Sequence, residues 1–128
     1  LLEVTRAALA AGIAAARAGA ATGDIGYAVA ASIGKGNGYD LVRELGGHGV
    51  GYRVHEPPDI PNFGKRGQGM RIPLGLVIAI EPMVTIGNGT IVTADDGWTV
   101  KTRSGNLAAH FEHTVLVTAG EPEILTIH

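Results

Sequence analysis

The chain has 128 residues, of which 45% are hydrophobic and 17% charged, and its formal net charge is −2. This composition is typical of a globular domain and excludes a disordered chain, which has fewer apolar residues and more net charge. The charge argues against a nucleic-acid-binding surface, which needs a clustered basic excess. No apolar run reaches the roughly 18 residues of a transmembrane helix. The chain has no cysteine, which excludes thiolate metal ligands and is compatible with a cytoplasmic location.

The first part of the chain predicts two helices. Residues 1 to about 18 are dominated by alanine, the best helix former, and a glycine follows them. Thr22 is the expected N-cap of the second helix, and Asp24 lies favourably in its first turn. Apolar residues then recur at helical spacing through 25–33, and the glycine-rich segment 34–38 ends the pattern.

Beyond Tyr39 the sequence changes to apolar runs separated by turn residues, which predicts strands. Strands are expected in the apolar segment 74–85, where the run 76–81 forms a strand that ends at Glu81, and at 90–94, 98–103 and 111–118. In the first of them, alternation places Ile78 and Ile80 on one face and Ala79 and Glu81 on the other. Two helices followed by a mostly antiparallel sheet predict an α+β domain over 1–128, with the helices packed on the sheet.

Three residues of metal-ligand type interrupt this pattern. His48 lies in a run of glycines, where a ligand could come close to the backbone, although a glycine-rich turn with an incidental histidine is an alternative. Glu81 ends an apolar strand and Glu112 begins another, and a buried carboxylate is costly unless it is paired or binds a cation. A solvent-exposed strand end or a salt bridge would also explain the two acids.

Other polar residues carry weaker signals. His55 follows soon after His48, and an imidazole there suits proton transfer or stabilisation of an oxyanion. One imidazole and two carboxylates, with His55 nearby, form a mixed ligand set that suits Mn, Fe, Co or Zn. The remaining polar residues are interpreted as structural, surface or turn residues: His110, His113, His128, the turn Asp95-Asp96, and the solvated charges Lys65 and Arg66.

Five short motifs that contain these residues occur in order between positions 47 and 114. They are Gly47-His48-Gly49-Val50-Gly51, His55-Glu56-Pro57-Pro58, Ile80-Glu81-Pro82-Met83, Asp96-Gly97-Trp98-Thr99-Val100 and Phe111-Glu112-His113-Thr114. Their order resembles that of the type I methionine aminopeptidases. The helical stretch before them is also similar to that family, so the resemblance covers essentially the whole chain.

The resemblance implies the C-terminal half of a pita-bread fold, in which two similar halves surround two divalent metal ions. It implies removal of the initiator methionine from peptides or from nascent polypeptides met at the ribosome, by attack of a metal-bridging water. In this scheme His48 and Glu81 would bind one metal and Glu112 would bridge both, with a carboxylate of the set moving the proton. His55 would contact substrate and stabilise the tetrahedral intermediate, and Trp98 would border the methionine pocket.

The chain also departs from the family pattern. The family takes two further Asp ligands and another histidine from its N-terminal half, and no such Asp pair precedes the motifs here. Because the chain begins with Leu1 and not Met, we expect it to be part of a longer protein and to be inactive alone. Val54 is smaller than the aromatic residue that some relatives carry there.

Two other functions remain open from the sequence. A non-catalytic binding protein of the same fold is one, although His48, His55, Glu81 and Glu112 together argue against it. A prolidase or Xaa-Pro aminopeptidase is the other, and the motif around Trp98 favours methionine over it.

Overall fold

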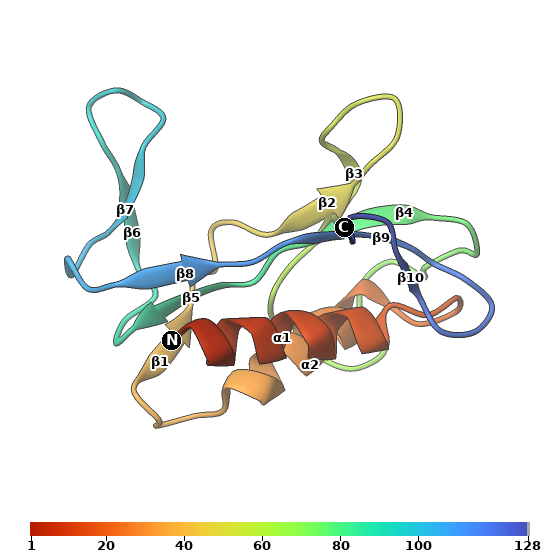
Figure 1. Ribbon diagram of the computed structural model, residues 1–128, viewed down its shortest axis with the longest axis horizontal. Helices are drawn as coiled ribbons and strands as arrows, with labels where there is room; N and C mark the ends of the chain where they lie inside the picture. Colours follow the sequence, from red (N-terminus) through yellow and green to blue (C-terminus); the bar gives the residue numbers. More distant parts are fainter. Residues whose placement is uncertain (128) are drawn as a thin grey trace.

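A computed structural model describes residues 1–127 of the chain. Two helices, α1 (Leu2–Ala15) and α2 (Thr22–Ile33), pack against each other on one side of the strands (Figure 1). This is the predicted α+β arrangement of helices on antiparallel sheets. No helix within the described residues is long and apolar enough to cross a membrane.

Both helices differ from the sequence prediction at one end. α1 ends at Ala15, earlier than residue 18, because the N–H of Ala16 bonds to the carbonyl of Ile13 at 2.9 Å and that of Arg17 to the carbonyl of Ala15 at 2.9 Å, which breaks the i to i−4 pattern. The N-cap of α2 is Ala21 and not Thr22. The hydroxyl of Thr22 instead accepts the N–H of Met70 at 3.2 Å, and Asp24 accepts the N–H of Ala21 at 2.7 Å.

The strands form two sheets and a separate hairpin, and all neighbouring strands are antiparallel. A five-stranded sheet has the order β10 (Glu123–Ile124), β9 (His113–Leu116), β4 (Val77–Ile80), β2 (Gly47–Gly49), β3 (Glu56–Ile60). A three-stranded sheet has the order β1 (Tyr39–Leu41), β5 (Met83–Ile86), β8 (Ala108–His110). The hairpin joins β6 (Ile91–Thr93) and β7 (Val100–Thr102) and projects from the body of the molecule (Figure 1).

The apolar segment 74–85 forms two strands, and the first ends next to Glu81, where the sequence placed a strand end, because the chain crosses from one sheet to the other at Glu81-Pro82. β4 pairs with β9, the last pair being Ile80 with His113, and β5 pairs with β8, beginning with Met83 opposite His110. The two neighbouring chain segments therefore change sheets together. Pro82 has no N–H to donate to a ladder, which makes this a suitable place for the break.

The core lies between the helices and the two sheets. Ile25 and Val29 of α2 and Ile78, Ile80 and Val115 of the sheet are all fully buried. The helices approach closely at Gly12, where a Cβ would overlap the side chain of Val29. This packing supports the sheet from the side opposite to its polar residues.

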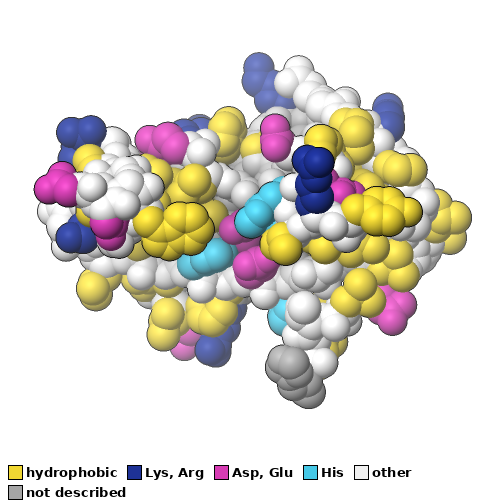
Figure 2. Space-filling view, turned by 90° about the horizontal axis from the view of Figure 1, so that it is seen from above, with side chains coloured by type: hydrophobic (Ala, Val, Ile, Leu, Met, Phe, Trp, Pro, Cys, Tyr) yellow, Lys and Arg dark blue, Asp and Glu magenta, His cyan; other side chains and the backbone are white. Residues whose placement is uncertain are grey.

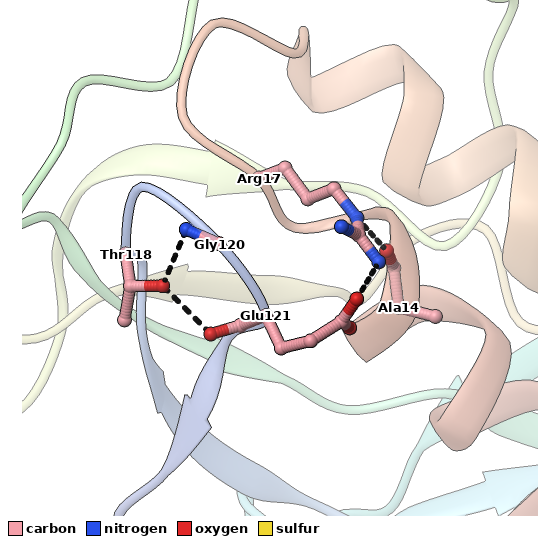
Figure 3. A network of polar contacts seen from close by, with 5 residues as sticks. All are labelled: Ala14, Arg17, Thr118, Gly120 and Glu121. Carbon is pink, nitrogen blue, oxygen red and sulfur yellow. Dashed lines mark hydrogen bonds and ion pairs between the residues drawn. The ribbon is translucent and has the colours of Figure 1, made fainter.

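A polar network connects the end of α1 to the turn between β9 and β10 (Figure 3). The Arg17 guanidinium contacts the Glu121 carboxylate at 2.6 Å and donates to the Ala14 carbonyl at 3.0 Å. The Thr118 hydroxyl donates to the Glu121 carbonyl at 2.7 Å. Because the side chains of Arg17 and Glu121 are 48% and 77% exposed, the ion pair contributes little to stability.

Candidate metal centre

His48 occupies the middle residue of β2, between β3 and β4. Glycine on each side is required by close backbone approach. A Cβ at position 47 would overlap the carbonyl oxygen of Ala79 on β4, and one at position 49 would overlap that of Pro57 on β3. The glycines thus let two neighbouring strands press against β2, and this fixes where the imidazole of His48 stands.

Glu81 and Glu112 lie at the point where the two paired segments change sheets. The last pair of the β4–β9 ladder is Ile80 with His113. Glu81 follows Ile80 and Glu112 precedes His113, so the two acids approach each other across the two segments. The carbonyl of Glu81 accepts a hydrogen bond of 3.0 Å from the amide of Asn62, which is 1% exposed. The side-chain amide replaces the ladder partner that the backbone loses at the break.

The three side chains converge. Ligand atoms of His48, Glu81 and Glu112 all lie within 4.8 Å of one another. Nδ1 of His48 lies 2.9 Å from the carbonyl of Gly49, and a carbonyl can only accept, so Nδ1 carries the proton. In the neutral ring, Nε2 then directs a lone pair toward Oε1 of Glu81, 3.4 Å away. Two facing acceptors beside a second carboxylate favour a cation between them, so the residues fit a divalent metal.

His110 joins this cluster although the sequence interpretation treated it as structural or surface. Its Nε2 lies 3.3 Å from Oε2 of Glu81. The hydrogen bond to Glu81 is the main reason that the pKa of His110 is raised above its usual value. The sequence carried no signal for this contact, because it depends on the pairing of β5 with β8.

His55 stands beside His48 just before β3, and the two rings meet edge to face with centroids 4.2 Å apart. Both histidines, with Glu81 and His110, line a cavity of about 540 Å³. Its other walls are mostly apolar and include Val42, Leu45, Met83, Ile91, Val100 and Ala109. Figure 2 shows histidine and acidic side chains gathered at the centre of this face, with hydrophobic side chains around them.

The sequence and the fold of the chain both match known proteins. The family model of metallopeptidase family M24 matches residues 1–119. The chain belongs to metallopeptidase family M24. The name of the family indicates use of a metal, which agrees with the mixed ligand set of His48, Glu81 and Glu112.

Members of the M24 family with high similarity include methionine aminopeptidases. Methionine aminopeptidase A of Synechocystis sp. is 44% identical over 127 residues, covering 99% of this chain and 50% of the relative. The enzyme of Aquifex aeolicus is 48% identical over 130 residues, covering 98% of this chain and 49% of the relative. The chain therefore spans about half the length of these relatives.

The solved structures agree. The methionine aminopeptidase of Rickettsia prowazekii matches with a TM-score of 0.95 and 42% identity, covering 99% of this chain and 51% of that one. The prolidase of Pyrococcus furiosus matches with a TM-score of 0.68 and 24% identity over 98% of this chain and 31% of that one, which shows the shared fold alone. The chain thus has about half of the pita-bread fold of this family.

Trp98, expected at the border of a substrate pocket in this M24 chain, lies near the tip of the β6–β7 hairpin and is 88% exposed. It is not among the residues that line the cavity. The hairpin turn is held by Asp96, whose carboxylate accepts from the hydroxyl of Thr99 and from the N–H groups of Trp98 and Thr99. The Thr99 hydroxyl is the main reason that the pKa of Asp96 is lowered. The role of Trp98 stays a prediction, whereas Asp95-Asp96 does form a turn.

Of the remaining residues interpreted from the sequence, one agrees with its prediction and one does not. His113 contacts the Thr126 hydroxyl through Nδ1 at 2.8 Å and lies outside the metal cluster, as expected. Arg66 was expected to be only solvated, but its guanidinium lies 4.5 Å from the ring centroid of Tyr27. His128 lies outside the described residues.

Proposed function

We propose that this chain supplies about half of the active site of an aminopeptidase that removes methionine from the N-terminus of polypeptides. The observation that carries the proposal is the convergence of His48, Glu81 and Glu112 within 4.8 Å. Relatives named methionine aminopeptidases are 44% and 48% identical to nearly the whole chain, which supports the substrate.

His48 and Glu81 would hold one divalent cation, and Glu112 would bridge it to a second, the ions being Co, Mn, Fe or Zn. Bound divalent cations supply Lewis acidity, which lowers the pKa of water and polarises a carbonyl group. Three ligands are too few for two ions with ordinary coordination numbers. We therefore propose that the complete protein, of the length of these relatives, contributes the missing ligands and that this half alone is inactive.

The cavity suggests how a peptide would be placed. Its mostly apolar walls suit the methionine side chain, and the polar cluster at one side suits the amide group to be cleaved. His55 lines the same cavity, so its ring can donate a hydrogen bond to the carbonyl oxygen as negative charge develops there. Glu81 or Glu112 would accept the proton from the attacking water and pass it to the leaving amine. Trp98 would border the substrate if the hairpin closes over it.

The proposal also includes a cellular location. An enzyme of this activity would act in the cytoplasm on peptides and on nascent polypeptides at the ribosome. Prolidase activity is less well supported, because the prolidase of P. furiosus matches with a TM-score of 0.68 and the methionine aminopeptidase of R. prowazekii with 0.95.

A substrate panel tests the proposal in the complete protein. The protein is stripped of metal with a chelator, reloaded with Mn²⁺ or Co²⁺, and offered Met-Ala-Ser and Ala-Pro-Ser peptides. We expect metal-dependent release of free methionine from the first peptide and no such release by a His48→Ala variant. Cleavage of Ala-Pro-Ser alone would support an Xaa-Pro aminopeptidase, and binding of the metal without cleavage of either peptide would support a non-catalytic protein.

A further inference from the structure

We propose that His110 is a positioning residue that holds Glu81 in the orientation in which Glu81 binds metal. The inference rests on the proposed metal site, and it adds a residue that the sequence motifs leave out. His110 is not itself within the set of three converging ligands, so its contribution would pass through Glu81.

The contact uses one carboxylate oxygen and leaves the other free. Nε2 of His110 lies 3.3 Å from Oε2 of Glu81, and a carboxylate can only accept, so the histidine donates. The other oxygen, Oε1, faces Nε2 of His48 at 3.4 Å. The two oxygens of Glu81 therefore have separate partners: one takes a hydrogen bond and the other points to the position for the cation.

The strand pairing explains why His110 reaches this place. His110 is the last residue of β8 and stands opposite Met83, the first residue of β5. Directly opposed residues of an antiparallel pair share one face of a sheet, and both side chains line the cavity. Glu81 lies two residues before Met83, at the break between the sheets, so the imidazole can reach it from the end of β8.

A fixed carboxylate should bind metal more tightly than a free one. The Glu81 side chain is only 12% exposed, so water cannot easily replace a lost hydrogen-bond donor. Without His110, either oxygen could turn toward the ion, and the side chain would lose rotational freedom on binding. Partners that orient metal ligands from behind are typically worth about 10–100-fold in affinity or activity.

The test measures metal affinity, which does not depend on turnover. Titration calorimetry with Mn²⁺ on the metal-free complete protein should give an affinity about 10–100-fold lower for His110→Ala than for the unchanged protein. His110→Gln, which keeps an N–H donor of similar reach, should recover most of this loss. Lys101→Ala removes a side chain from the wall of the same cavity and leaves the metal ligands intact, so the Mn²⁺ affinity of this variant should be unchanged.

A spectroscopic measurement distinguishes positioning from a general structural effect. The visible spectrum of bound Co²⁺ reports ligand geometry, and we expect it to change in His110→Ala and to return toward the original in His110→Gln. Equal affinity and an unchanged spectrum in His110→Ala would overturn the proposal, as would a His110→Gln protein as weak as His110→Ala. If the unchanged protein binds Mn²⁺ but releases no methionine, the proposed function fails while the positioning role of His110 stands.

Discussion

Replacing Gly47 with alanine should damage both the sheet and the metal centre. The added Cβ would lie well inside 3.0 Å of the carbonyl oxygen of Ala79, and it would also press on the Cβ of Ile60 at 3.2 Å. Because the obstacle on β4 is backbone, no side-chain rotation relieves the overlap. β2 must therefore move away from β4, and His48, the next residue, must move with it.

The size of the effect follows from this overlap. Overpacking of a tight interior typically costs about 1–3 kcal/mol, and we expect the free energy of unfolding to fall by that amount. Metal coordination tolerates ligand displacements of only about 0.2 Å, so a shift of β2 should also lower Mn²⁺ affinity about tenfold or more. The two losses should appear together, since both come from the separation of β2 and β4.

Gly120 offers a matched control. A Cβ at position 120 meets nothing within 4 Å, and its φ is not positive. Gly120→Ala should therefore change stability by no more than about 1 kcal/mol, in the stabilising direction, and leave metal affinity alone. Both quantities are measured on the complete protein. Urea denaturation monitored by circular dichroism gives the free energy of unfolding, and titration calorimetry gives the Mn²⁺ affinity. A Gly47→Ala protein as stable and as tight-binding as Gly120→Ala would refute the close packing of β2 on β4.

Three further predictions concern single side chains. Glu112→Gln should abolish methionine release and lower the number of bound metal ions, measured by atomic absorption; full turnover would contradict its role as a bridging ligand. Asp24→Ala should lower the free energy of unfolding by about 1 kcal/mol, the usual contribution of a helix cap. The pKa of Asp24 is lowered from 3.8, chiefly by its hydrogen bond from Ala21, so this contribution should be constant above about pH 5 and disappear as the pH falls through the lowered pKa. A double-mutant cycle between Arg17 and Glu121 should give about 0.2–1 kcal/mol that decreases with salt; a coupling above 2 kcal/mol would contradict an exposed ion pair.

The residues that the sequence identified share a visible conflict between their chemistry and their surroundings. Glu81 and Glu112 stand out because a charge at the end of an apolar strand is costly to bury, and His48 stands out because glycines surround it. The structure partly buries Glu81 but leaves Glu112 exposed, so the burial argument applies to Glu81 alone. The structure brings all three together. The helices were predictable because alanine content and the spacing of Ile25 and Val29 act locally.

What the sequence did not reveal depends on contacts between distant residues. β2 has three residues, two of them glycines, and glycine disfavours strands unless tertiary packing requires it. The sequence indicated that a strand ends at Glu81, but it did not indicate that the chain changes sheets there, because the change of sheet depends on which strands pair. His110 has no unusual neighbours in sequence, and only the register that sets it opposite Met83 places it on Glu81.

The central claim is that His48, Glu81 and Glu112 bind divalent cations together. Anomalous diffraction at the manganese absorption edge, from crystals of the complete protein grown with Mn²⁺, tests it most directly. We predict anomalous peaks within bonding distance, about 2.0–2.3 Å, of Nε2 of His48 and of a carboxylate oxygen from each glutamate. Bound manganese at another position, with these three side chains free of it, would contradict the account.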